Sequence, residues 1–295
     1  MKVLMTGCNG QLGQSITKEM NHKDFELLSF SKENLDITNI NELTYTIEKL
    51  QPHFLVNTAA YTSVDGAETN KDLAYKINQH GAKNLGIVSK RYNLPIIHFS
   101  TDFVFDGKSK VPYSTTSKTN PINVYGQSKL LGEKEILSLS DNFIIIRTSW
   151  VFSEFGNNFL KSITKNIAAG RDLRVISDQY GSPTYAGDIA KLVIQIIRSS
   201  QDYQLPNSIF HYAGNPIVSW YDFAKEIHGQ CLGFENFKSI DINNEIRAIS
   251  TSEYSNALAP RPSFSALSTT KIMSIYSISP SNWKDRINEC LKQLS

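Results

Sequence analysis

The sequence predicts an α/β protein with a doubly wound parallel sheet and a smaller, interleaved second domain. In the first half, short β-branched runs alternate with longer segments that have helical spacing. After about Val151 this rhythm loosens, and helical patterns are separated by stretches that contain proline and asparagine. Strands that alternate with helices form parallel sheets, and right-handed crossovers place those helices on both faces.

The expected elements divide the chain at residues 1–151 and 152–295. Strands are expected at residues 2–6, 25–29, 54–57, 96–100 and 143–147, where β-branched and aromatic residues gather. In the second part, helices are expected at residues 158–169, 186–199, 220–228 and 282–294. Leu173–Ile176 has a strand pattern, so the chain is expected to return to the first sheet near residues 171–200.

Composition limits the class of partner. The chain has 295 residues, 40% of them hydrophobic, and a formal net charge of only +2. This charge gives no electrostatic basis for binding nucleic acid or an anionic membrane. Three dispersed cysteines do not make a disulfide framework, which favours a reducing compartment such as the cytoplasm. The longest apolar run, residues 143–146, is far shorter than the roughly 20 residues of a membrane span.

A glycine-rich turn follows the first expected strand directly. It places Gly7, Gly10 and Gly13 three residues apart, ahead of a helical pattern. Gly7 permits a tight turn, Gly10 lets the backbone approach a pyrophosphate, and Gly13 lets helix and strand pack closely. The helix N-terminus adds unpaired N–H groups and a positive dipole. The turn predicts a Rossmann-type NAD(P)-binding domain, and an ordinary glycine-rich turn is the alternative.

The residues after the second expected strand bear on the choice of cofactor. An NAD-selective site carries an acidic residue at this strand end. This chain has Ser31 and Lys32 there, which suit a 2′-phosphate and favour NADPH, with NADH as the alternative cofactor. In the other interpretation Lys32 is simply solvated.

Tyr125 and Lys129 form the most informative pair in the sequence. Residues four apart on a helix share a face, so the phenol and the ammonium can point into one site. A nearby positive charge lowers a tyrosine pKa from about 10, toward the range of general acid–base catalysis. The alternative is that Lys129 pairs with Glu133 on a solvated face, with Tyr125 as a half-buried aromatic residue.

A third polar element stands at the end of the fourth expected strand. Ser100, Thr101 and Asp102 close this strand. Ligands of open α/β sheets bind at the carboxyl ends of the strands. A hydroxyl, a phenol and a lysine downstream of a phosphate-binding loop together predict a hydride-transfer site.

These motifs resemble those of the extended short-chain dehydrogenases/reductases, and within them the dTDP-4-dehydrorhamnose reductase family. The resemblance covers nearly the whole chain and implies NAD(P)H-dependent reduction of the C4 keto group of dTDP-4-dehydro-L-rhamnose. It also implies a homodimer. Its motifs, in chain order, are residues 7–13, 35–39, 56–65, 100–107, 123–129, 147–151, 178–185 and 219–221.

The resemblance implies a role for individual residues. Tyr125 would donate the proton, Lys129 would bind the nicotinamide ribose and tune Tyr125, and Thr101 would hold the substrate carbonyl. Other cofactor-binding residues would be Gly7, Gly10, Gln11, Leu12, Gly13, Asp36, Ile37, Ala60, Tyr61, Thr62 and Phe99. The nucleotide sugar would contact Val64, Thr101, Asp102, Trp150 and Arg261. Some members use Mg²⁺, but no ligand cluster here requires it, so no metal site is predicted.

Several alternatives stay open. Phe103 stands where the family usually has tyrosine, which leaves the identity of the sugar open and admits another nucleotide-linked 4-keto sugar. Trp150 is either a substrate contact or a core residue. A non-catalytic NADP-binding regulatory subunit shares this fold, although it would not need to keep Thr101, Tyr125 and Lys129 together. An epimerase or dehydratase of nucleotide sugars is a further, less similar alternative.

Overall fold

A parallel six-stranded sheet forms the centre of the computed structural model, which describes residues 1–20, 24–234, 245–254 and 257–294. The strand order is β10-β5-β4-β3-β1-β2, and every neighbouring pair is parallel. Because β1 lies between β2 and β3, the doubly wound sheet predicted from the sequence is confirmed. The strands are β1 (Lys2–Thr6), β2 (Glu26–Phe30), β3 (Phe54–Asn57), β4 (Ile96–Thr101), β5 (Phe143–Thr148) and β10 (Ser208–His211).

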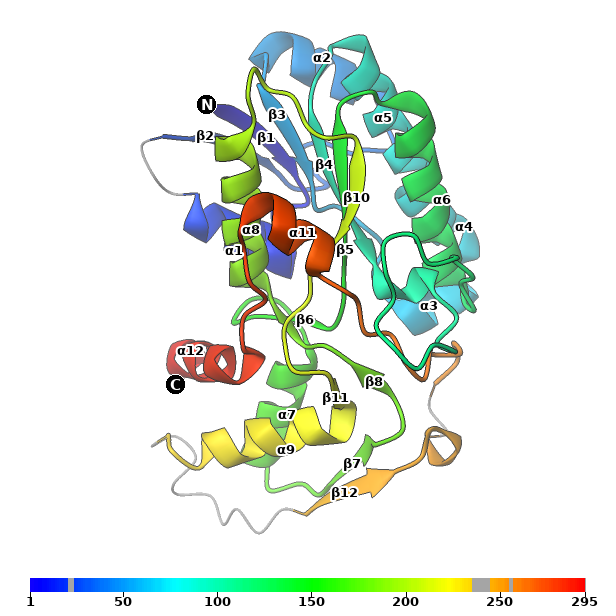
Figure 1. Ribbon diagram of the computed structural model, residues 1–295, viewed down its shortest axis with the longest axis vertical. Helices are drawn as coiled ribbons and strands as arrows, with labels where there is room; N and C mark the ends of the chain where they lie inside the picture. Colours follow the sequence, from blue (N-terminus) through cyan, green and yellow to red (C-terminus); the bar gives the residue numbers. More distant parts are fainter. Residues whose placement is uncertain (21–23, 235–244, 255–256, 295) are drawn as a thin grey trace.

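Helices cover both faces of this sheet (Figure 1). One face packs against α1 (Gln11–Glu19), α8 (Ala186–Ser199) and α11 (Thr270–Tyr276). The other packs against α2 (Ile40–Leu50), α5 (Ala82–Arg91) and α6 (Val124–Leu139). Successive strand residues serve the two faces in turn, as a period of two requires: Val3 and Met5 join the first core, and Leu4 joins the second. Burial on both faces explains why these strands read as continuous apolar runs.

Short helical segments connect the strands near the carboxyl edge of the sheet. α3 (Val64–Thr69), α4 (Lys71–Tyr75) and the π-helix η1 (Lys76–Gly81) follow β3, and the 3₁₀ turn η2 (Asp102–Val104) follows β4. Asn78 lies buried in the π-helix. Its amide accepts from the N–H of Tyr61 at 2.9 Å and donates to the carbonyl of Tyr61 at 3.0 Å and to Ser128 Oγ at 2.9 Å. The loop after β3 is therefore fixed against α6.

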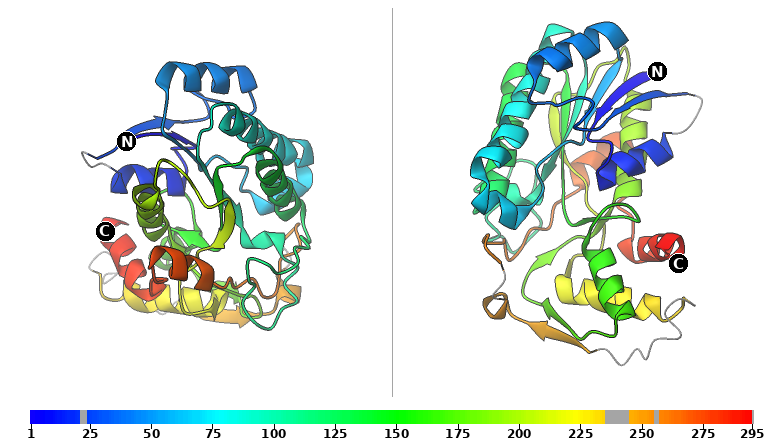
Figure 2. Two further views of the ribbon diagram at one scale, coloured as in Figure 1. Left: turned by 45° about the horizontal axis from the view of Figure 1, so that its top comes forward. Right: turned by 180° about the vertical axis from the view of Figure 1, so that it is seen from behind.

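The second half of the chain builds a smaller lobe at the carboxyl edge of the sheet (Figure 2). This lobe has its own apolar core, in which Phe152, Ile163, Phe223 and Trp283 are buried. Its helical segments are α7 (Phe159–Ala168), α9 (Trp220–Cys231), η3 (Thr251–Glu253) and α12 (Trp283–Leu294). Its strands pair as β6 (Val151–Phe152) with β9 (Thr184–Tyr185), β8 (Tyr180–Gly181) with β11 (Val218–Ser219), and β7 (Leu173–Ile176) with β12 (Ile246–Ile249). No helix in the described ranges is both long and apolar enough to cross a membrane.

The expected return of Leu173–Ile176 to the first sheet is wrong. This strand pairs in parallel with Ile246–Ile249, and Val175 belongs to the core of the smaller lobe. The chain returns instead through α8, which packs on α1, and through β10, which pairs with β5. Because β10 follows Pro206 and Asn207 and begins with a serine, its sequence does not stand out as a buried strand.

Candidate active site

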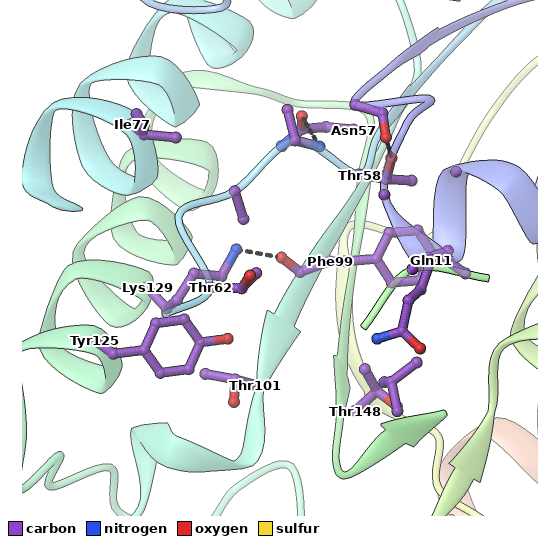
Figure 3. Close-up of a pocket in the computed structure, with 18 of the residues that line it drawn as sticks. Gln11, Asn57, Thr58, Thr62, Ile77, Phe99, Thr101, Tyr125, Lys129 and Thr148 are labelled. Carbon is purple, nitrogen blue, oxygen red and sulfur yellow. Dashed lines mark hydrogen bonds between the residues drawn. The ribbon is translucent and has the colours of Figure 1, made fainter. Parts of the chain in front are cut away.

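A cavity of about 900 Å³ lies at the carboxyl ends of β1, β3, β4 and β5, where the smaller lobe meets the sheet. This is the position at which open α/β sheets bind their ligands. The side chains of Thr101, Tyr125 and Lys129 lie near one another at one side of this cavity, and Gln11 and Thr148 lie at the other (Figure 3). Its volume is in the range of pockets that hold organic cofactors.

Nearly all of the residues that the sequence singled out line this one cavity. Of the cofactor-side residues, those that line it are Gly7, Gly10, Gln11, Leu12, Gly13, Asp36, Ile37, Ala60, Thr62, Phe99, Tyr125 and Lys129. The substrate-side residues Val64, Thr101, Asp102, Trp150 and Arg261 line it as well. Tyr61 is not among the lining residues, and its backbone is instead held by Asn78. The described residues contain no group of three or more His, Cys, Asp or Glu side chains that could hold a metal ion.

The three glycines of the first loop differ in what surrounds them. Gly7 has φ +78°, and a Cβ there would lie 2.4 Å from the backbone N of Ala59. A Cβ on Gly13 would lie 2.5 Å from the Gly7 carbonyl oxygen. A Cβ on Gly10, by contrast, would meet only Gly7 O at 3.4 Å, so the protein's own packing does not require glycine there. The bare backbone of Gly10, at the start of α1, fits the close approach of a pyrophosphate.

Two segments hold this loop in place. The Thr58 hydroxyl lies 2.7 Å from the carbonyl oxygen of Thr6 and 3.0 Å from that of Gly7, which ties the turn to the end of β3. On the other side, Gln11 Oε1 accepts hydrogen bonds from Asn158 Nδ2 at 2.9 Å and Ser153 Oγ at 3.2 Å. Because Asn158 also caps α7, the smaller lobe is connected directly to the glycine-rich turn.

Lys129 is buried at the floor of the cavity. Its Nζ donates a 2.6 Å hydrogen bond to the carbonyl oxygen of Phe99, drawn as a dashed line in Figure 3. Burial lowers the pKa of Lys129 to about 8, against an opposing effect of the Glu133 charge. Glu133 itself is buried and accepts two hydrogen bonds from Arg147, at 2.8 and 2.7 Å. The solvated Lys129–Glu133 pair, considered as an alternative from the sequence, is therefore wrong.

Tyr125 lies half-buried on the same face of α6 as Lys129. The expectation that Lys129 lowers the pKa of Tyr125 is wrong, because burial dominates and raises that pKa to about 12. The neighbouring Thr101 hydroxyl partly offsets this effect, and the charge of Asp102 adds to it. Tyr125 is accordingly a neutral phenol at pH 7. It can give a proton to an alkoxide that forms within hydrogen-bonding distance.

Two buried side-chain oxygens in residues that line the cavity have no hydrogen-bond partner within the described part of the chain. Thr101 Oγ1 donates to Asp102 Oδ1 at 3.0 Å, but Asp102 Oδ2 has no hydrogen bond within the described part of the chain. Burial raises the pKa of Asp102 to about 6, and the hydrogen bond from Thr101 partly offsets the rise. The Thr148 hydroxyl, opposite Thr101 in the β4–β5 register, is also buried without a partner among these residues. Orphaned polar atoms that line a cavity suit a polar ligand.

The part of the cavity that is expected to receive the substrate is rich in aromatic surface. Trp150, at φ +47°, stacks on Trp220 with ring centroids 3.5 Å apart and planes 6° apart. Both residues line the cavity. Trp150 therefore packs against a neighbouring side chain and also faces the cavity, so the two alternatives are not exclusive. Phe103 packs edge-on against Tyr125, with centroids 5.6 Å apart. An aromatic wall beside polar groups suits a ligand with a planar base and a sugar.

Some cavity residues had not been identified from the sequence. Thr148 follows Arg147 at the end of β5, and a polar residue at that strand end was the available signal. Residues 156–159 and Trp220 reach the cavity from the smaller lobe. Their local sequence pattern does not indicate a position at the cavity, because that position depends on how α7 and α9 dock.

Comparisons with known proteins agree with this geometry. The family model described as RmlD substrate binding domain matches residues 1–295. A protein of Aggregatibacter actinomycetemcomitans named dTDP-4-dehydrorhamnose reductase is 41% identical over 286 residues, covering 96% of each chain. A crystal structure of such a reductase from Clostridium acetobutylicum superposes with a TM-score of 0.90 at 34% identity, covering 100% of this chain and 99% of the other. Another from Bacillus anthracis, in complex with NADP, gives 0.89 at 31% identity and covers 99% of both chains. The chain belongs to the RmlD substrate binding domain family.

Proposed function

We propose that this protein reduces the C4 keto group of dTDP-4-dehydro-L-rhamnose with NADPH and releases dTDP-L-rhamnose. The observation that carries the proposal is the position of Thr101, Tyr125 and Lys129 in the same cavity as the glycine-rich turn. The names of the relatives support the choice of sugar. The bound NADP of the Bacillus anthracis structure supports the choice of cofactor.

The residues present fit a dinucleotide. Gly10 and the first turn of α1, which carries no acidic residue, would receive the pyrophosphate. Asp36 and Ile37 would border the adenine, and Ala60, Thr62 and Phe99 would lie along the nicotinamide half. Bound NADPH would supply the hydride that reduces the carbonyl carbon. Lys129 would hold the nicotinamide ribose from the floor of the site.

The protein itself contributes a proton donor that is held in position. Thr101 would turn its single hydroxyl proton from Asp102 to the keto oxygen and orient it by a hydrogen bond, and Tyr125 would protonate that oxygen as it gains charge. Because the pKa of Tyr125 is raised to about 12, the phenol carries its proton throughout the neutral range. An alkoxide is the stronger base, so the transfer is downhill. The ammonium of Lys129 would then stabilise the phenolate.

We propose the following division of labour between the two parts. Residues 1–151 bind the dinucleotide, and residues 152–295 mainly bind the sugar nucleotide, with α8 and β10 supporting the first sheet. On the substrate side, Val64, Asp102, Trp150 and Arg261 would contact the nucleotide sugar. Phe103 presents no hydroxyl next to Tyr125, which supports a second candidate: reduction of a related nucleotide-linked 4-keto sugar.

A direct assay tests the proposal. Purified protein is incubated with NADPH and dTDP-4-dehydro-L-rhamnose while nicotinamide absorbance is followed, and the sugar product is analysed by NMR. Oxidation of NADPH with formation of dTDP-L-rhamnose is expected. Oxidation only with another 4-keto sugar would favour the second candidate. Absence of oxidation with every 4-keto sugar, despite NADPH binding, would favour the non-catalytic subunit.

We further propose that NADPH is used at least as well as NADH. Ser31 is buried and Lys32 exposed at the end of β2, where both line the cavity together with Glu33. A 2′-phosphate would meet the cation of Lys32 and would compete with Glu33 for the Ser31 hydroxyl. The comparison is kcat/KM for the two cofactors, in wild type and in Lys32→Ala. A strong preference of the wild type for NADH would contradict the proposal.

The family resemblance also supports a cytoplasmic homodimer. Three free cysteines, Cys8, Cys231 and Cys290, are consistent with a reducing compartment. Light scattering of the purified protein across a concentration series distinguishes dimer from monomer. Fractionation of the source cells tests the compartment.

A further inference from the structure

Asp65, directly after Val64 at the start of α3, fastens a distant segment of the chain to the cavity. Its Oδ1 accepts hydrogen bonds from the backbone N–H groups of Leu258 and Ala259, at 3.0 and 2.9 Å. The same carboxylate accepts from Arg261, through Nη1 to Oδ1 at 3.1 Å and Nη2 to Oδ2 at 2.6 Å. One side chain therefore sets both the path of the backbone before Arg261 and the position of its guanidinium.

These contacts leave one edge of the Arg261 guanidinium available. Nη1 also donates to the carbonyl oxygen of Ala259 at 3.1 Å, so Nη1 is fully used. Nη2 uses one N–H on Asp65, and Nε has no partner in the described ranges. Of the five donors of an arginine, the Nε–H and one Nη2 N–H remain. These two donors are parallel and match two oxygens of one phosphate group.

Among the described cationic residues that line the cavity, Arg261 is the one available to an anion on the substrate side. The described cationic residues that line it are Lys32, Lys129 and Arg261. Lys32 follows β2, at the adenosine end, and Lys129 is buried against Phe99. Arg261 lines the cavity together with Val64 and Trp150, and its side chain is 23% exposed. A nucleoside diphosphate bound beside Trp150 thus meets a single arginine.

We propose that Asp65 is a positioning residue for substrate binding: it holds Arg261 with its Nε–Nη2 edge free to bind the diphosphate of the nucleotide sugar. The inference rests on the proposed function for the identity of that diphosphate. Asp65 itself does not touch the reacting atoms. It acts through Arg261. Because it already restricts the rotamers of Arg261 in the free protein, Arg261 loses less conformational entropy when the diphosphate binds.

The direction in which Asp65→Asn changes the affinity for the diphosphate distinguishes a positioning role for Asp65 from a purely electrostatic one. Asp65 carries a negative charge near the place of a dianionic ligand, so on charge alone Asp65→Asn should tighten diphosphate binding. If Asp65 positions Arg261, the same substitution weakens binding, because an amide nitrogen replaces one acceptor and Arg261 is released. Loss of one charge-assisted hydrogen bond corresponds to a weakening of about tenfold or more.

Calorimetric titration of the full chain, saturated with NADP⁺, tests this with dTDP and thymidine as probes. Asp65→Asn is expected to raise the Kd for dTDP about tenfold and to leave thymidine binding within about twofold. In turnover it should raise KM with little change in kcat. Asp24→Asn is the matched control, because Asp24 pairs with the exposed Arg198 outside the cavity, and it should change neither. Unchanged or tighter dTDP binding by Asp65→Asn would overturn the proposal.

A double-mutant cycle separates positioning from general loop stability. In an Arg261→Ala background, Asp65→Asn should have less than about a twofold further effect on dTDP binding, whereas an equal loss in both backgrounds would overturn the proposal. Arg261→Lys keeps the charge and loses the planar fork, so about tenfold weaker dTDP binding is expected even if the Asp65 variants do not fold. Wild-type affinity in Arg261→Lys would overturn it. The wild type and the variants could bind dTDP with the expected affinities while the wild type reduces no 4-keto sugar. That result would contradict the proposed function and not the role of Asp65.

Discussion

Lys129 donates its hydrogen bond to the carbonyl oxygen of Phe99, 2.6 Å away, and leaves Glu133, one helical turn further along α6, to Arg147. This arrangement joins α6, which carries Tyr125, to the end of β4, which carries Thr101. It also keeps the ammonium in the cavity, because Glu133 is already paired with the buried guanidinium of Arg147.

The charge of Lys129 gives a prediction for the pH dependence of the reaction. Burial lowers the pKa of Lys129 to about 8, so the ammonium is present below pH 8 and is lost as the pH rises through that value. The kcat/KM of the wild type should therefore fall above about pH 8, since this parameter reports ionisations of the free enzyme. Lys129→Arg should be slower but lack this descending limb, because arginine stays charged. A wild-type profile that stays flat to pH 10 would contradict the assignment.

Two glycines of the same loop should respond differently to alanine. A Cβ on Gly13 would lie 2.5 Å from a backbone oxygen, so Gly13→Ala should lower the melting temperature. A Cβ on Gly10 meets nothing closer than 3.4 Å, so Gly10→Ala should leave the melting temperature nearly unchanged but weaken NADPH binding. Thermal melts and cofactor titrations of both variants check this. Equal loss of stability would show that Gly10 serves packing and not the cofactor.

Asp102 should destabilise the folded protein at neutral pH. Its pKa is raised from 3.8 to about 6 by burial, so the folded state holds the proton more tightly than the unfolded state. The stability that this proton provides is fully present below pH 3.8 and is lost as the pH rises through 6. The whole effect is about 3 kcal/mol, and roughly half of it develops between pH 5 and pH 7.5.

Asp102→Asn removes this ionisation. The variant should gain stability relative to wild type as the pH rises from 5 to 7.5, by about 1 kcal/mol in urea-unfolding free energy. Asp24→Asn, at an exposed position, serves as the control. A difference between variant and wild type that is the same at both pH values would argue against a buried, poorly compensated carboxyl.

The first half of the fold and most of the site can be predicted from the sequence, because the sequence signals there are local. Gly7, Thr101 and the Tyr125–Lys129 pair each follow a recognisable strand or share a helical turn. The failures concern long-range packing. Whether Leu173–Ile176 joins the first sheet depends on residues 246–249, far along the chain. The pKa of Tyr125 depends on burial, which spacing on a helix does not reveal. Trp220 and residues 156–159 enter the site only through the docking of the smaller lobe on the sheet.

The central claim is that Tyr125 donates the proton to the C4 oxygen. Its most direct test is a single-turnover measurement with enzyme-bound NADPH and dTDP-4-dehydro-L-rhamnose, which compares wild type with Tyr125→Phe. General acid catalysis contributes about 10²–10⁴-fold, so the variant should lose that much of the chemical rate. It should bind NADPH nearly as tightly as wild type. Full wild-type rate in Tyr125→Phe, under conditions where chemistry is rate-limiting, would contradict the claim and move the proton to another group, with Asp102 the next candidate.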